Sequence, residues 1–175
     1  MIELHPIQEE HAGTVLRWRR QPSTIKHNPV KNFSLEELKI HINREESDLS
    51  NLNEKSSYRW IALKNKILVG NASLKNINLM MNYAEIGYGV GEEFQGQGYG
   101  SIIVESLVEM VFEKTPIRKL MAYVHDKNIP SCKILDKIGF RREGLLREHY
   151  IINGKPENEI LFGSLKHEFM KMRTL

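Results

Sequence analysis

The chain has 175 residues, of which 41% are hydrophobic, and a formal net charge of +3 from 25 basic and 22 acidic residues. This length can close one good-sized hydrophobic core but is short for two, so we expect a single domain over residues 1–175. The near balance of charge gives no strong field to attract nucleic acid. The single cysteine, Cys132, excludes an intrachain disulfide and a zinc cluster of several cysteines.

The sequence also lacks the patterns that direct a chain to a membrane. Residues 1–6 (MIELHP) have neither the basic segment nor the apolar core of a signal peptide. No stretch approaches the ~18 apolar residues that a membrane-spanning helix needs. We therefore expect a cytoplasmic protein with no membrane partner.

The first residues predict a strand followed by a helix. Residues 2–5 have the composition of a short strand, and residues 7–20 place apolar side chains at helical spacing until Pro22 stops the pattern. Trp18 is flanked by arginines, a combination that could stack on nucleic acid. Its helical spacing instead favours a core position, so we expect no direct binding of nucleic acid.

A second helix is predicted to begin at Ser34. The sequence SLEE at residues 34–37 forms a capping box, and Phe33 can pack onto Leu38 just inside the helix. The expected buried face of this helix consists of Leu35, Leu38 and Ile42. Residues 51–57 then have the composition of a polar loop.

The middle of the chain predicts an antiparallel meander. Three β-rich runs, at residues 58–64, 67–74 and 83–90, are separated by short polar connections, and Asn65-Lys66 forms the first turn. The period then changes to 3.6, with one apolar helix face formed by Tyr99, Ile102, Ile103, Leu107, Met110 and Val111.

A strand predicted at residues 120–124 follows that helix, and a strand-helix-strand order requires a parallel crossover. The last helix begins near Asn128 and ends at Gly139, a residue type that commonly stops helices in the left-handed conformation. Strands at 141–152 and 158–165 complete the chain, joined by an Asn153-Gly154 turn.

Residues 92–100 (EEFQGQGYG) leave a strand and open a helix. Backbone amides at such a point lie at the positive end of the helix dipole, and glycines remove the β-carbons that would keep an anion away. A flexible loop is the alternative, but the strand before it and the amphipathic helix after it favour an anion site. The chain has no Gly-Lys-Ser/Thr ending of a Walker loop, and the glycine spacing is not that of a dinucleotide fingerprint.

These motifs resemble those of the GNAT superfamily of acetyl-CoA-dependent N-acetyltransferases. Residues 95–100 (QGQGYG) look like the family's Q/R-x-x-G-x-G/A pyrophosphate loop, and residues 128–131 (NIPS) with 137–140 (KIGF) look like its second cofactor motif. Other stretches are similar to the branch that acetylates N-terminal residues of ribosomal proteins, namely residues 84–88 (AEIGY), 143–148 (EGLLRE) and 153–155 (NGK). The resemblance spans nearly the whole chain and is specific from about Tyr83 onward.

The resemblance implies an α/β (α+β) fold whose mixed, mostly antiparallel sheet is split like a V and flanked by helices. The pantetheine arm of acetyl-CoA would lie in the gap between strands 83–90 and 120–124. It also implies a bulge near residues 88–90, and Gly87, Gly89 and Gly91 are compatible with either a bulge or a frayed strand end. The implied cofactor-binding residues are Tyr88, Gly89, Val90, Gln95, Gly96, Gln97, Gly98, Tyr99, Gly100, Ser101 and Asn128, with no metal.

Acyl transfer from a thioester to an amine needs a neutral amine, a polarised carbonyl and a proton donor for the leaving thiolate. Many family members have a tyrosine donor at the position of Leu135. The resemblance suggests the Ser131 hydroxyl instead, with helix capping as the structural alternative. Glu85 is the candidate base, although strand alternation leaves open whether it faces the substrate or bulk water. His125 and His149 are weaker candidates for the base.

The resemblance implies an amine acceptor, by its closest branch a protein or peptide N-terminus, attacked directly without an acyl-enzyme. The alternatives are a polyamine or aminoglycoside acceptor, or a noncatalytic acyl-CoA-binding module. The early helices and loops that would set the acceptor contain no decisive residue. We expect a monomer or a homodimer.

Overall fold

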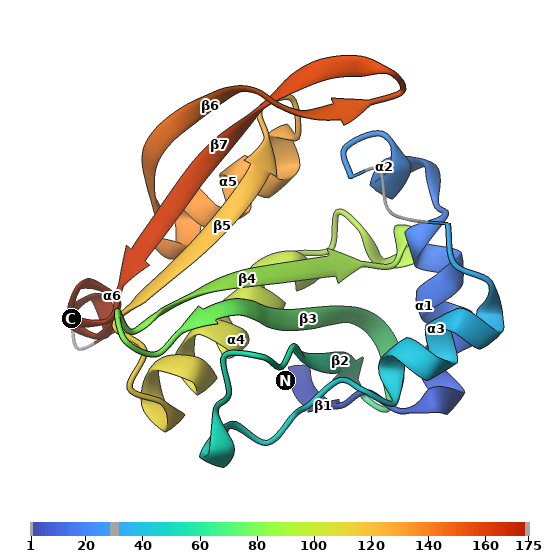
Figure 1. Cartoon of the computed structure of the whole chain (residues 1–175), viewed down its shortest axis with the longest axis horizontal. Helices are drawn as coiled ribbons and strands as arrows, with labels where there is room; N and C mark the ends of the chain where they lie inside the picture. Colours follow the sequence, from blue (N-terminus) through green and yellow to red (C-terminus); the bar gives the residue numbers. More distant parts are fainter. Residues whose placement is uncertain (1, 29–31, 174–175) are drawn as a thin grey trace.

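A seven-stranded sheet in the order β1-β2-β3-β4-β5-β7-β6 runs through the molecule (Figure 1). The computed structural model describes residues 2–28 and 32–173. Neighbouring strands are antiparallel except β4 and β5, which are parallel, so the predicted meander and crossover are confirmed. The strands are β1 (Ile2–Pro6), β2 (Tyr58–Lys64), β3 (Ile67–Asn78), β4 (Tyr83–Val90), β5 (Lys119–His125), β6 (Arg141–Ile152) and β7 (Lys155–Leu165).

Helices flank this sheet, and three further turns are 3-10 helices. The α-helices are α1 (Ala12–Arg19), α2 (Pro22–Ile25), α3 (Leu35–Ile42), α4 (Tyr99–Lys114), α5 (Ile129–Ile138) and α6 (Lys166–Arg173). The 3-10 helices are η1 (Glu9–His11), η2 (Leu49–Asn51) and η3 (Glu92–Phe94). Pro22 begins α2 rather than simply ending α1, because proline has no amide hydrogen to lose at a first helical position.

The sheet is split between β4 and β5, as predicted. Only three residue pairs join these strands, the last of them Glu85 with Met121. Beyond Glu85 the two strands diverge like the arms of a V, with β5, β6 and β7 on one arm and β1 to β4 on the other (Figure 1).

The bulge expected near residues 88–90 is absent from the described strands. The register of β3 against β4 runs without a shift from Gly70 and Val90 to Lys75 and Glu85. The end of β4 therefore lacks a partner strand on one side because β5 has turned away, and not because β4 is bulged.

The main core lies between α4, α5 and the sheet. The buried face of α4 consists of Ile103, Val104, Leu107, Val108, Val111 and Phe112. Ile102 was predicted on this face but is 41% exposed, because its neighbour Ile103 takes the inward position on the helix.

A smaller core joins α1, α3 and β2. The predicted capping box of α3 is confirmed: Ser34 Oγ accepts from the Glu37 amide at 3.2 Å, and Glu37 Oε2 accepts from the Ser34 amide at 2.8 Å. Leu38 and Ile42 are buried as expected, whereas Leu35 in the first turn is 40% exposed.

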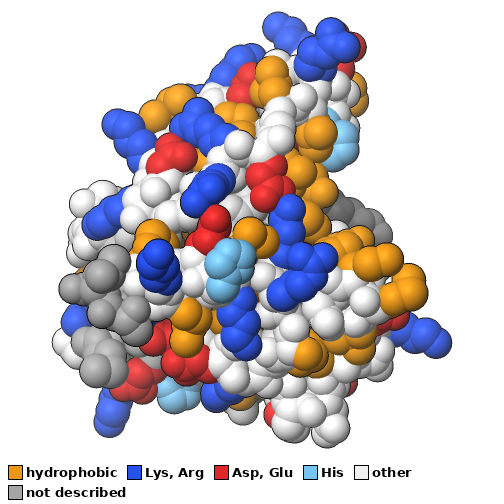
Figure 2. Space-filling view, turned by 90° about the vertical axis from the view of Figure 1, so that its left-hand side faces the viewer, with side chains coloured by type: hydrophobic (Ala, Val, Ile, Leu, Met, Phe, Trp, Pro, Cys, Tyr) orange, Lys and Arg blue, Asp and Glu red, His pale blue; other side chains and the backbone are white. Residues whose placement is uncertain are grey.

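Charges of both signs cover the side of the molecule where α6 lies. Figure 2 shows basic and acidic side chains interspersed with hydrophobic ones on this face, as the nearly balanced composition leads one to expect. None of the described helices is both long enough and apolar enough to cross a membrane.

Candidate active site

The loop that precedes α4 has the conformation of an anion-binding turn. Gly96 and Gly98 have φ of +74° and +82°, and Gly98 is the N-cap of α4. A β-carbon at either glycine would meet nothing within 4 Å, so the space beside the loop is open. The first-turn amides of Tyr99, Gly100 and Ser101 are left without helical acceptors, which favours an anion here.

Some residues of this loop are already engaged by other parts of the protein. Gly100 is buried, and a β-carbon there would lie 2.7 Å from Ile134 Cδ1, so its small size serves the packing of α4 on α5. This corrects the expectation that Gly100 clears a path for the anion. Gln95 Nε2 donates to Ser23 Oγ at 3.1 Å, which ties the loop to α2. Gln97 Nε2 donates to a backbone carbonyl of η3.

Gln21, between α1 and α2, holds the start of this loop, a role that no sequence pattern indicates. Its Nε2 donates to the Val90 carbonyl at 3.0 Å, and its Oε1 accepts from the Glu92 amide at 2.9 Å. The side chain of Trp18 packs against Gly91, since a β-carbon on Gly91 would lie 2.4 Å from Trp18 Nε1. Trp18 is buried, as its helical spacing predicted.

Tyr88 and Ser131 meet across the split of the sheet. Tyr88 Oη lies 2.6 Å from Ser131 Oγ and 3.3 Å from the Ser131 carbonyl. Asn128 is the N-cap of α5, and its Oδ1 accepts from the Ser131 amide, so Ser131 does not cap this helix. Burial raises the pKa of Tyr88 to about 12 despite its bond to Ser131, so the phenol keeps its proton at neutral pH. Leu135 is fully buried.

Glu85 is neither free nor in bulk water. Its side chain is 11% exposed, and its oxygens contact Lys75 Nζ at 2.9 Å and Asn76 Nδ2 at 2.6 Å. Ala84 and Ile86 belong to the core that β4 shares with α4, so alternation places Glu85 on the opposite face of the sheet from Tyr88.

Two polar side chains of β3 cover the glycines of β4 on the face of Glu85. A β-carbon on Gly87 would lie 2.7 Å from Ser73 Oγ, and one on Gly89 would lie 3.3 Å from Asn71 Nδ2. These glycines therefore make room for Ser73 and Asn71. Both polar residues were missed in the sequence, because only the register of β3 against β4 identifies them.

A histidine pair bridges the open end of the split. His125 ends β5 and is buried, and its Nδ1 lies 2.9 Å from Nδ1 of His27, which follows α2. Tyr150 Oη donates to the His27 carbonyl at 2.6 Å. Burial, and then the charge of His125, lower the pKa of His27. His149 is half-exposed and bonds Glu159 at 2.6 Å.

Acidic groups lie beside His125. Its Nε2 is 3.4 Å from Glu157 Oε2, and donor atoms of His125, Asp126 and Glu157 lie within 4.8 Å of one another. Lys127 Nζ lies 2.5 Å from Glu157 Oε2 and lowers the pKa of that carboxyl. The ammonium group of Lys127 therefore already places a positive charge beside these carboxylates, as a metal ion would.

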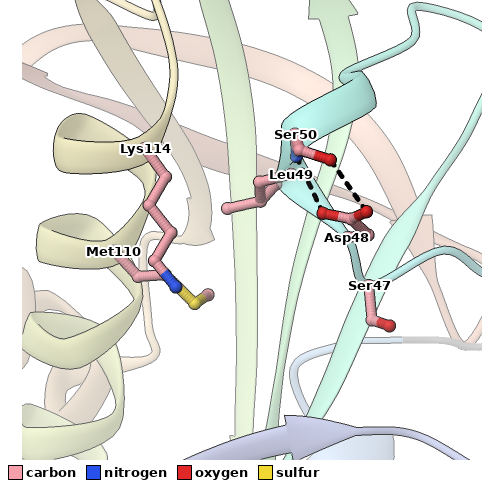
Figure 3. A pocket seen from close by; sticks show the side chains of 6 residues that line it. All are labelled: Ser47, Asp48, Leu49, Ser50, Met110 and Lys114. Carbon is pink, nitrogen blue, oxygen red and sulfur yellow. Dashed lines mark hydrogen bonds between the residues drawn. The ribbon is translucent and has the colours of Figure 1, made fainter.

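Two cavities in the described part of the protein differ in their distance from these residues. One of about 420 Å³ lies between η2 and the end of α4, where Lys114 and Met110 extend toward Asp48 and Ser50 (Figure 3). It lies at the opposite end of α4 from Gly98 and contains none of the candidate residues. The other, of about 610 Å³, adjoins the loop and is lined by Arg17, Trp18, Gln21, Glu92 and Glu93.

Comparisons with known proteins agree with this geometry. The chain matches the family model for the acetyltransferase (GNAT) domain over residues 2–141. It is 25% identical over 168 residues to the uncharacterized N-acetyltransferase p20 of Bacillus licheniformis, covering 96% of this chain and 94% of that protein. It is 27% identical over 174 residues to spermidine N(1)-acetyltransferase of Escherichia coli K12, covering 97% and 88%.

Solved structures share the fold. A spermidine N-acetyltransferase from Vibrio cholerae in complex with CoA and spermine superposes with a TM-score of 0.84 at 19% identity, covering 97% of this chain and 98% of that one. RimL, a ribosomal L7/L12 alpha-N-protein acetyltransferase in complex with CoA, gives a TM-score of 0.81 at 20% identity, covering 94% and 93%. The chain belongs to the GNAT family of N-acetyltransferases, which use acetyl-CoA as co-substrate.

Proposed function

We propose that this enzyme transfers the acetyl group of acetyl-CoA to the α-amine of a peptide or protein N-terminus. The amine would attack the thioester carbonyl directly. A carbon–nitrogen bond forms, the carbon–sulfur bond breaks with its electron pair on sulfur, and the proton lost by the amine balances the proton that the thiolate gains.

The residues around the split fit the two ends of acetyl-CoA. Amides of the Gly96–Ser101 segment would bind the diphosphate, because the loop glycines leave the space beside them open. The edge of β4 from Tyr88 to Val90, which pairs with no strand on the β5 side, and the Asn128 side chain would bind the pantetheine amides. Ser131 would donate a hydrogen bond to the sulfur.

The environment of Glu85 carries the choice of acceptor. Lys75 and Asn76 already contact its carboxylate, so an acceptor amine would share these oxygens with two existing partners. An α-amine has an ordinary pKa of about 7.7–8.0 and a lysine-like amine one of about 10.4. An α-amine is thus neutral far more often at cellular pH, and it needs less help from a carboxylate that already has two partners.

A polyamine is the second candidate. Asp126 follows β5, Glu157 and Glu159 lie beside its last residue on β7, and these carboxylates could attract the distal ammonium groups of such an acceptor. Relatives named as spermidine acetyltransferases add weight to this alternative.

An acceptor panel with acetyl-CoA separates these functions. The panel contains a lysine-free peptide with a free α-amine, an N-terminally blocked peptide with one lysine, spermidine, an aminoglycoside and a blank. We expect the fastest thiol release with the free α-amine. Preference for spermidine would reject the α-amine assignment. Calorimetric binding of acetyl-CoA with no thiol release for any amine would indicate a noncatalytic binding module.

A further inference from the structure

Tyr88 and Ser131 form a contact that connects the free end of β4 with the first turn of α5. Their hydroxyl oxygens are 2.6 Å apart, at a point where β4 has no partner strand on the β5 side. Ser131 is expected at the leaving sulfur, and the tyrosine that many family members carry is replaced by the buried Leu135.

Either hydroxyl can donate in this contact, and the phenol can also donate to the Ser131 carbonyl. Tyr88 has one hydrogen, and Ser131 Oγ at 2.6 Å is a closer acceptor than the Ser131 carbonyl at 3.3 Å. When the phenol donates to Oγ, the hydrogen of Ser131 is free to point into the split. The amide of Ser131 is bonded to Asn128, so capping does not compete for the hydroxyl.

We propose that Tyr88 is a positioning residue, whose phenol donates to Ser131 Oγ and thereby directs the Ser131 hydrogen toward the leaving sulfur. This inference rests on the proposed function, in which Ser131 stabilises the thiolate. Neither hydroxyl gives up its proton. The carbon–sulfur bond breaks, the electron pair stays on sulfur, and the bond from Ser131 strengthens as that charge develops.

Two hydrogen bonds in series polarise one another, so the phenol makes Ser131 a better donor as well as an oriented one. The raised pKa of Tyr88 supports this arrangement, because the phenol remains a donor over the pH range of an assay. Tyr88→Phe keeps the ring and removes only the donor.

The first test is a double-mutant cycle of Tyr88→Phe and Ser131→Ala, assayed with the best acceptor of the panel. We expect Tyr88→Phe to lower kcat about 10-fold while the affinity for acetyl-CoA changes by less than about 2-fold. In the Ser131→Ala background the same change should have almost no further effect. Independent losses that add, or an unchanged kcat in Tyr88→Phe, would overturn the inference.

Tyr58→Phe is the matched control. Its hydroxyl is also engaged, accepting from the Asn53 amide at 2.9 Å and donating to the Asn51 carbonyl at 3.1 Å, but it lies outside the candidate site. This variant should lose stability without losing kcat. Thermal unfolding of all variants separates a folding defect from a loss of positioning.

The role of Tyr88 can also be tested by a binding measurement that does not require catalysis. CoA and desulfo-CoA are titrated calorimetrically from about pH 7 to pH 9.5, across the ordinary pKa of a thiol, about 8.5. The affinity for CoA should rise with pH more steeply in wild type than in Tyr88→Phe. The affinity for desulfo-CoA should show the same pH dependence in both proteins. Equal pH dependence of the CoA affinity in both would reject the role of Tyr88. A wild type that releases no thiol with any amine would reject the proposed function alone, since this titration still reports on Tyr88.

Discussion

Glu85 lies at the last residue pair before β4 and β5 separate, with its carboxylate held by Lys75 and Asn76. In the proposed function, Glu85 would assist by taking a proton from the acceptor amine. That assistance matters most where the amine is mostly protonated, which for an α-amine means below its pKa of about 7.7–8.0.

Replacement of Glu85 by glutamine should therefore lower kcat/KM most at low pH, by about 100-fold near pH 6. The measurement is a pH profile of both forms on one α-amine peptide. Glu143→Gln is the control, because it also removes an ion pair, at 2.6 Å from Lys119, but on β6. Profiles that run parallel for Glu85→Gln and wild type would remove Glu85 from the mechanism.

Some of these residues could be identified from the sequence, whereas their contacts could not. Asn128 and Ser131 could be picked out because they stand at fixed offsets in a motif. The pairing of Tyr88 with Ser131 could not, because it depends on how α5 packs beside the end of β4. Lys75 is the cross-strand neighbour of Glu85, whereas Asn76 reaches it from the register shift between Lys75 and Asn78, where Asn76 takes a φ of +48°.

At the scale of elements, the loop before α4 is open to a direct test. Gly98 and Gly154 both have positive φ, +82° and +76°, and a β-carbon at either meets nothing within 4 Å. Valine costs a similar backbone strain of about 1–2 kcal/mol at both. Only Gly98 lies at the N-cap of α4.

Gly98→Val should therefore weaken acetyl-CoA binding by more than about 100-fold, whereas Gly154→Val should leave it unchanged. Calorimetry on both folded variants provides the comparison. An unchanged affinity for acetyl-CoA in Gly98→Val would contradict the assignment of the diphosphate site.

Gln21 couples the α1–α2 segment to the end of β4. Gln21→Ala leaves the Val90 carbonyl and the Glu92 amide without this partner, so the free energy of unfolding should fall by about 1–3 kcal/mol. Urea denaturation measures the loss. Gln97→Ala, at an exposed position, should cost less than about 0.5 kcal/mol. Equal losses in both would show that the bridge is not structural.

Element boundaries could be predicted where a turn residue marks them. The ends of β2 and β4 and the stop of α5 at Gly139 are confirmed. β3 continues to Asn78, beyond the predicted Leu74, and α1 starts only at Ala12 after η1. Apolar spacing alone does not separate a 3-10 turn from the first turn of an α-helix.

At the scale of the whole molecule, the His27–His125 pair joins the segment after α2 to the end of β5. The pKa of His27 is lowered in the folded protein, first by burial and then by the charges of His125 and Lys26. The unfolded chain therefore binds a proton at His27 more readily. The stability from this pair is complete above about pH 6.5, the ordinary histidine pKa, and is lost as the pH falls below it.

Urea denaturation from about pH 5 to pH 8 tests this linkage. We expect His27→Gln to flatten the fall in unfolding free energy below about pH 6.5. His167→Gln, exposed on α6, is the control and should follow wild type. A wild-type curve that His27→Gln leaves unaltered would contradict the role of the pair.

The split sheet could be anticipated because the loop and the α5 motif resemble a family with that fold. The bridge from His27 to β5 could not, since the two histidines are 98 residues apart and no local pattern relates them.

The most direct test of the central claim is an internal competition. Equal concentrations of an α-amine peptide and spermidine share one reaction with limiting acetyl-CoA, and mass spectrometry gives the ratio of the two acetylated products. That ratio equals the ratio of the kcat/KM values, because both acceptors draw on the same enzyme. We predict that acetylated peptide exceeds acetylspermidine by more than about 10-fold. An excess of acetylspermidine would contradict the account.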